Sequence, residues 1–83
     1  MFRISISPNA KSQLKNLKQK YKNAIALIIE DIKENPYLGK PLGRELIGKY
    51  SYRVGVFRII YKINKQDNIV QVLSAGHRST IYN

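Results

Sequence analysis

The 83-residue chain has no cysteine, no tryptophan and a single histidine. Without cysteine it can form neither a disulfide scaffold nor a thiolate metal site. One histidine and five acidic residues scattered along the chain also argue against a conventional metal site. The Gly39-Lys40-Pro41 segment lacks the spacing of a phosphate-binding loop. We therefore expect a protein that works without a metal or another cofactor.

Long apolar runs are missing as well. The longest covers residues 24–29, whereas a membrane helix needs about 20 apolar residues. The first residues also lack the extended apolar stretch of a secretory signal. We therefore expect one soluble domain, residues 1–83, located in the cytoplasm.

Acidic residues are scarce, with 5 Asp and Glu against 15 Lys and Arg and a formal net charge of +10. Such a surplus on a small surface attracts polyanions, which points to nucleic acid, the ribosome or an acidic protein as the partner. Hydrophobic residues make up 43% of the chain, which is too many for a disordered basic tail. The composition predicts a folded basic domain and leaves the choice of polyanion open.

The first part of the chain is predicted to form one strand and two helices. Apolar and polar residues alternate over residues 2–6, which is the period of a strand. Ser7 is a good helix cap, and Pro8 fits the first helical turn. A first helix is predicted to bury Ala10, Leu14, Leu17 and Tyr21, and a second helix, capped by Asn23, to bury Ile25, Ile28, Ile29 and Ile32.

The second part is predicted to be a loop followed by three antiparallel strands. Residues 35–48 are rich in proline and glycine and are expected to be a connector. Strands are predicted over 50–54, 56–63 and 69–75, with a tight turn near Gly55. The order β-α-α-β-β-β predicts an α+β fold in which two N-terminal helices pack on a small, mostly antiparallel sheet. In the middle strand, the helices are expected to cover Phe57, Ile59, Tyr61 and Ile63, with Arg58, Ile60 and Lys62 on the other side.

Three arginines are candidates for a phosphate site. Arg53 and Arg58 are expected on neighbouring strands across the Gly55 turn, and Arg78 follows the strand that pairs with the middle one. Each guanidinium group can donate two parallel hydrogen bonds to a phosphate, and fixed positive charge stabilises a reacting phosphate. The alternative is that Arg53 and Arg58 are ordinary solvated strand residues.

Two more side chains are candidates for moving a proton. Tyr82 acts as a base near neutral pH only where positive neighbours favour its phenolate, and the alternative is that it anchors the end of the chain. His77 is the one side chain that titrates near neutrality in its unperturbed form. No acid that could orient it lies nearby in the sequence, so the alternative is that it covers the sheet edge.

The order and spacing of these residues resemble one protein family. Residues 50–63, YSYRVGVFRIIYKI, followed by GHRSTIY at residues 76–82, are similar to the C-terminal half of the RelE/ParE toxin superfamily. Ser7-Pro8 with the lysine-rich helix, and Asn35-Pro36 followed by GKPL, extend the resemblance over essentially the whole chain.

The resemblance implies a toxin of a type II toxin–antitoxin system, of the RelE-like branch that cleaves messenger RNA in the ribosomal A site. It implies that Arg58 and Arg78 hold the reacting phosphate, that Arg53 is a basic residue on the preceding strand, and that Tyr82 is the base. The implied partners are the ribosome, messenger RNA and a cognate antitoxin with an acidic or amphipathic segment. Residues expected to bind RNA or the ribosome are Lys11, Lys15, Lys18, Lys49, Lys62 and His77.

Two departures from the family pattern keep other functions open. Ser51 stands where a second basic residue is common, with Lys49 as a possible substitute, and Tyr82 stands close to Arg78 with almost no tail beyond it. One alternative is a ParE-like inhibitor of DNA gyrase without nuclease activity. The other is a degenerate homologue that only binds an antitoxin or nucleic acid.

Overall fold

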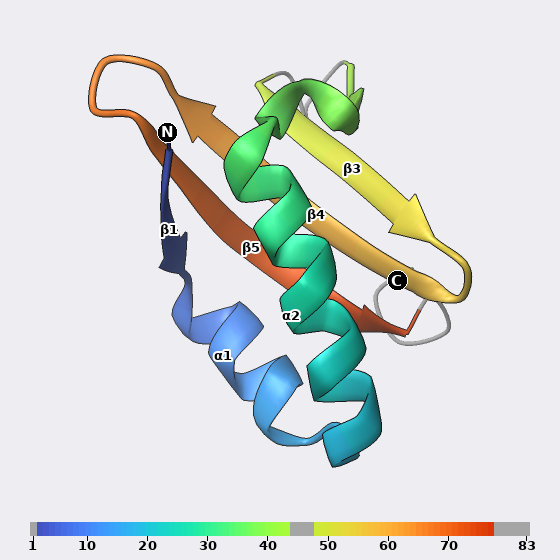
Figure 1. Cartoon of the computed structure of the whole chain (residues 1–83). Coiled ribbons are helices and arrows are strands. Elements are labelled where there is room, and N and C mark those ends of the chain that lie inside the picture. Colours follow the sequence, from blue (N-terminus) through green and yellow to red (C-terminus); the bar gives the residue numbers. More distant parts are fainter. Residues whose placement is uncertain (1, 44–47, 78–83) are drawn as a thin grey trace.

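The computed structural model describes residues 2–43 and 48–77 as a five-stranded sheet with two helices on one side (Figure 1). The strand order is β1-β5-β4-β3-β2, with β1 parallel to β5 and the other neighbours antiparallel. This arrangement confirms the predicted α+β class. The elements are β1 (Arg3–Ile6), α1 (Pro8–Lys15), α2 (Gln19–Glu34), the 3₁₀ helix η1 (Pro36–Leu38), β2 (Lys40–Pro41), β3 (Lys49–Val54), β4 (Phe57–Asn64) and β5 (Ile69–His77).

The two helices meet earlier in the chain than the apolar pattern predicted. Helix α1 ends at Lys15 and α2 begins at Gln19, so Asn23 lies inside α2 and does not cap it. Between them, the Leu17 amide donates to the Leu14 carbonyl at 3.1 Å and closes a tight turn. This turn changes the direction of the chain, so that α2 crosses the sheet at an angle to α1 (Figure 1).

The start of α1 is tied to β5. Ser7 Oγ accepts a hydrogen bond from the Ala10 amide at 3.1 Å, which confirms the predicted cap, and donates to the Leu73 carbonyl at 3.1 Å. The Gln13 side-chain oxygen accepts from the Ala75 amide at 2.9 Å. Between these contacts the register of β5 against β4 shifts, which leaves Leu73 as the extra residue of a β-bulge. The bulge reverses which later side chains of β5 face the helices.

The core lies between the helices and the sheet. Its α2 residues are Ile25, Ile28 and Ile32, as the apolar stripe predicted, and Ile29 is half-buried beside them. The other buried hydrophobic residues are Ala10, Ile59, Tyr61, Val70, Val72 and Ala75, with Phe57 and Ile63 packed at their margin.

No helix in the described part of the chain is long and apolar enough to span a membrane.

The segment predicted as a connector also adds an edge strand. Strand β2 pairs with β3, with Lys40 opposite Ser51 and Pro41 opposite Tyr50. Proline is acceptable there because an edge strand leaves one row of backbone groups unpaired. A strand of only two residues has no alternation that sequence analysis could detect.

The buried Tyr61 hydroxyl holds this segment in place. Tyr61 Oη donates to the Pro36 carbonyl at 2.6 Å and accepts from the Gly39 amide at 3.0 Å. A Cβ atom at position 39 would collide with the same hydroxyl oxygen, so the close approach requires glycine. Tyr61 therefore links the core to the segment that forms β2.

The Tyr61 hydrogen bonds predict a loss of stability in alkaline solution. Burial raises the pKa of Tyr61 to about 12 from its ordinary value of 10.0. The folded state therefore holds the phenol proton more tightly than the unfolded chain does, and the resulting stabilisation is complete below pH 10 and lost as the pH rises through about 12. Urea unfolding of the wild type should show this loss, and Tyr61→Phe should show a smaller one.

Tyr61→Phe should also lower the free energy of unfolding at neutral pH by about 1–3 kcal/mol, because two buried backbone groups lose their partner. Tyr37→Phe is the control, since the Tyr37 side chain is 48% exposed. If Tyr61→Phe and the wild type lost stability equally between neutral and alkaline pH, the role given to this hydroxyl would be wrong.

Candidate nucleic-acid interface

In the described part of the chain, the side of the sheet that faces away from the helices carries cations and no acid. Paired residues on neighbouring strands share a face, so the register fixes this assignment. No described strand contains Asp or Glu. We call this side the helix-free face, and its cations are Arg3, Lys40, Lys49, Arg53, Arg58 and Lys62.

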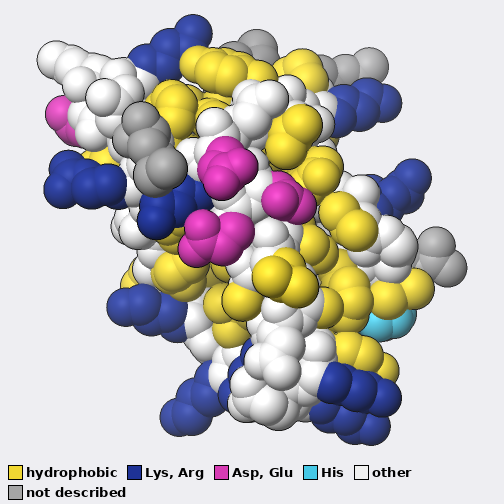
Figure 2. Space-filling model, viewed as in Figure 1, with side chains coloured by type: hydrophobic (Ala, Val, Ile, Leu, Met, Phe, Trp, Pro, Cys, Tyr) yellow, Lys and Arg dark blue, Asp and Glu magenta, His cyan; other side chains and the backbone are white. Residues whose placement is uncertain are grey.

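The acids lie elsewhere. Figure 2, viewed from the helix side, shows acidic side chains gathered near the middle of that side and cations around its margin. Glu30, Asp31 and Glu34 belong to α2, and Asp67 belongs to the turn after β4. The described acids therefore lie away from the helix-free face, and the potential above that face is positive.

Two pairs of like charges lie directly opposite each other on this face. Across β3 and β4, Arg53 pairs with Arg58 and Lys49 pairs with Lys62. Like charges opposite one another on a sheet are destabilising. The pairing follows from the two-residue turn after Val54, where Gly55 has a φ of +60°, a value that favours glycine. A bound anion would offset the repulsion that this register imposes.

A hollow of about 520 Å³ lies beside the arginine pair. Within it the Arg58 side chain is half-buried, whereas Arg53 is exposed. Burial, and next the charge of Arg53, lower the pKa of Arg58 from its ordinary value, but an arginine remains charged at neutral pH. The residues that line this hollow are Leu38, Lys40, Leu42, Ser51, Tyr52, Arg53 and Arg58.

Lys40 is the site residue that sequence analysis missed. It lines the same hollow as both arginines and is the register partner of Ser51. The chain therefore has a cation beside the position where Ser51 interrupts the expected basic pattern. The available signal was the Lys-Pro dipeptide after a proline turn, which fits a short edge strand as well as a loop.

The end of β5 places His77 away from the arginines. Gly76 pairs with Arg58, and His77 pairs with Phe57. The His77 ring meets the Phe57 ring edge-on, with 6.4 Å between centroids, on the helix-covered side. Without the bulge at Leu73, simple alternation would have put His77 on the helix-free face. Gly76 has no side chain that could cover Arg58.

The other predicted residues divide into separate groups. Lys49 and Lys62 share the helix-free face with the arginines, whereas Lys11, Lys15 and Lys18 are exposed on α1 and in the turn that follows it. The predictions for Arg78 and Tyr82 lie outside the described residues. Within residues 2–43 and 48–77, no three His, Asp or Glu side chains are grouped to hold a metal ion.

Comparison with known proteins assigns nearly the whole chain to one group. A family model described as the ParE toxin of the type II toxin–antitoxin system parDE matches residues 4–82. Toxin RelG of Mycobacterium tuberculosis is 38% identical over 63 residues, which is 70% of this chain and 72% of the relative. Toxin RelE of the same organism is 30% identical over 98% of this chain and 86% of the relative.

A solved structure agrees with the fold. A chain in the crystal structure of the toxin–antitoxin complex RelBE2 from Mycobacterium tuberculosis matches this one with a TM-score of 0.86 and 30% sequence identity. The match covers 93% of this chain and 98% of that one. The arrangement of helices and sheet is therefore shared with a chain of a structurally characterised toxin–antitoxin complex.

If the arginine pair is repulsive, removing one partner should stabilise the protein. Arg53→Gln should raise the free energy of unfolding by about 0.2–1 kcal/mol at low salt. The gain should shrink as salt screens the remaining charges. Urea unfolding at low and high salt measures both effects. Lys11→Gln removes the same charge from an exposed position on α1, and an equal gain in that variant would refute a pair-specific repulsion.

Proposed function

The chain belongs to the RelE/ParE family of type II toxin–antitoxin toxins, and on this basis we propose that it is a ribosome-dependent endoribonuclease that cleaves messenger RNA in the A site. The observation that supports this function most directly is the Arg53–Arg58 pair beside Lys40 in one hollow. Several fixed cations around one hollow suit a phosphate that gains negative charge during reaction.

The proposed reaction uses the substrate's own 2′-hydroxyl. Its oxygen forms a bond to the adjacent phosphorus, and the bond from phosphorus to the 5′ oxygen breaks. One proton leaves the attacking hydroxyl and another reaches the departing oxygen, giving a 2′,3′-cyclic phosphate and a 5′-hydroxyl. DNA lacks the 2′-hydroxyl and is therefore not a substrate.

We assign the residues of the site as follows. Arg58 and Arg53 neutralise the phosphate oxygens, because they are the described guanidinium groups beside the hollow. Arg78 and Tyr82 keep the roles that the family resemblance gives them, phosphate binding and proton acceptance. The half-buried position of Arg58 strengthens its interaction with an anion, because less water screens it.

The remaining charges suit the proposed partners. Lys11, Lys15 and Lys18 project from the helical side and would contact ribosomal RNA while the helix-free face holds the message. A cognate antitoxin with an acidic segment would neutralise the same face and block the site. These partners place the protein in the cytoplasm.

The gyrase-inhibitor alternative has lost its main support. Ser51 favoured it, because a second basic residue was missing there. In the structure, Lys40 lies opposite Ser51 and lines the hollow, so a cation is present beside that position. The relatives at 30% identity or more carry RelE and RelG names. We therefore prefer RNA cleavage.

Controlled expression in a bacterial host tests the proposed activity. The wild type should arrest growth and produce cuts in translated messages that keep phase with codons. Arg58→Ala should reduce cleavage by about a hundredfold or more, because one electrostatic contact to the reacting phosphate is lost. Intact messages in arrested cells would contradict the proposal, and inhibition of supercoiling by purified gyrase would favour the alternative.

Lys40 gives a prediction that the family pattern alone does not make. Lys40→Gln should reduce the cleavage rate about tenfold, and Ser51→Lys in the Lys40→Gln background should restore part of it, because the new cation lies in the adjacent strand position. Cleavage of a translated message in a purified system measures both. Lys65→Gln removes a charge from the turn after β4 and serves as the control. Equal rates for Lys40→Gln and Lys65→Gln would remove Lys40 from the site.

A further inference from the structure

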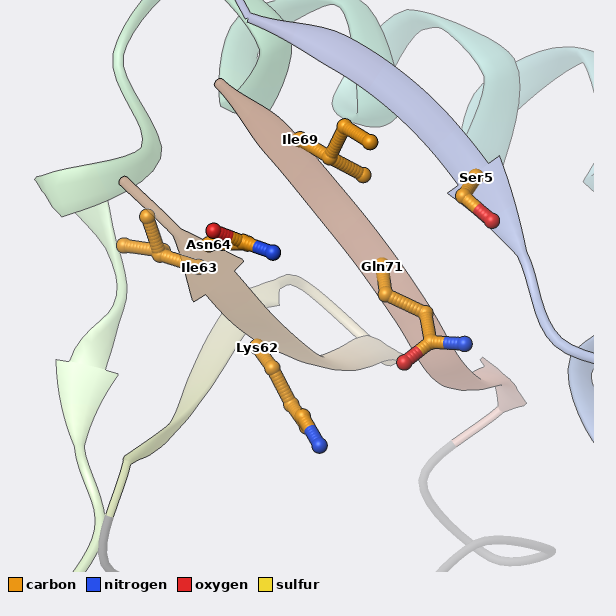
Figure 3. A pocket seen from close by; sticks show the side chains of 6 residues that line it. All are labelled: Ser5, Lys62, Ile63, Asn64, Ile69 and Gln71. Atoms are coloured by element: carbon orange, nitrogen blue, oxygen red, sulfur yellow. The ribbon is translucent and has the colours of Figure 1, made fainter. Parts of the chain in front are cut away.

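A second hollow lies on the sheet about four residues along β4 from the arginine pair. Its volume is about 320 Å³. Figure 3 shows Lys62 and Gln71 projecting from adjacent strands, with Ser5 on the strand beyond. The lining residues are Ser5, Lys62, Ile63, Asn64, Ile69 and Gln71.

The polar residues of this hollow form one row across the sheet. Ser5 pairs with Gln71, Gln71 pairs with Lys62, and Lys62 pairs with Lys49. We call these four residues the lysine row. The row offers ammonium, amide and hydroxyl donors side by side, which are the groups that bind phosphate and sugar oxygens.

Within the described residues, the donors of the lysine row do not hold other parts of the fold in place. Within residues 2–43 and 48–77, no side-chain hydrogen bond engages Ser5, Lys62 or Gln71. Asn64 differs, because its Nδ2 donates to Asp67 Oδ2 at 3.1 Å and its Oδ1 accepts from the Asp67 amide at 3.1 Å. Asn64 therefore builds the turn, while Lys62 and Gln71 are available to a ligand.

The row and the arginine pair lie along a single line. Arg58 and Lys62 are on the same face of β4 and about 13 Å apart, at roughly 3.3 Å per residue. Ile60 lies between them, flanked by Ser51 and Ser74 on the neighbouring strands. Cations at both ends of an uncharged band suit a single strand, because its backbone carries a phosphate at every nucleotide.

We propose that the lysine row is a second binding site for the RNA strand whose reacting phosphate lies at Arg53 and Arg58, and that it holds the backbone about two nucleotides from the cut. This inference rests on the proposed function, because it takes the arginine pair as the reaction site. It assigns Lys62, Lys49 and Gln71 to positioning the message and to no step of the reaction.

At the lysine row, RNA fits better than an acidic protein segment does. A protein segment gains most of its affinity from large apolar or aromatic anchors seated in pockets. Beside the lysine row, the described apolar surface consists of Ile60, Ile63, Ile69 and the short side chains around them. Two repulsive cation pairs at a fixed separation suit a ligand with regularly repeated charge.

Binding of uncleavable RNA of two lengths tests the proposal. Fluorescence anisotropy would use single strands of about three and about twelve nucleotides, with every 2′-hydroxyl methylated. Lys62→Gln should weaken binding of the long strand severalfold and lower the slope of log affinity against log salt by about 0.7, with little effect on the short strand. Arg58→Gln should weaken both, and Lys20→Gln, on α2, should weaken neither.

The outcomes separate the two proposals. If Lys62→Gln affects neither strand or both equally, while Arg58→Gln weakens both, the second site is wrong and the reaction site stands. If Arg58→Gln affects neither strand, the proposed reaction site itself fails. A poly-glutamate peptide of matched charge provides the third arm, and a Lys62→Gln effect on the peptide alone would assign the row to a protein partner and overturn the inference.

Discussion

Repulsion between Arg53 and Arg58, and between Lys49 and Lys62, is the constraint that organises this molecule. Strand residues alternate between two faces, so burying Ile59 and Tyr61 under the helices necessarily places Arg58 and Lys62 on the other side. The hydrophobic core stabilises the sheet enough to tolerate this crowding. The cations then remain where a polyanion can approach from solvent. Binding of a polyanion would offset the repulsion between like charges that the folded protein retains.

The core also determines the edge of the site. Tyr61 is buried among the core residues, and its hydroxyl binds both the Pro36 carbonyl and the Gly39 amide. These bonds hold the segment from which Lys40 reaches the hollow beside the arginines. A change in the core can therefore alter the charge around this hollow without touching any residue that lines it.

Much of this arrangement could be predicted from the sequence, because it follows from local periodicity. Alternation identified the strands, and with them the shared face of Arg53 and Arg58. The turn between the helices could not be predicted, since the apolar stripe continues through Leu17. The face of His77 depends on a bulge held by contacts with α1, and the position of Lys40 depends on a hydrogen bond from a core tyrosine. Both are long-range effects without a local signal, while Arg78 and Tyr82 remain predictions from the family resemblance.

A crystal structure with a single-stranded RNA that lacks the 2′-hydroxyl at the reacting nucleotide would test the central claim most directly. Our account predicts that the strand crosses the helix-free face, with one phosphate between the guanidinium groups of Arg53 and Arg58. An RNA seated on the helical side, or a strand on the sheet whose phosphates avoid both arginines, would contradict it.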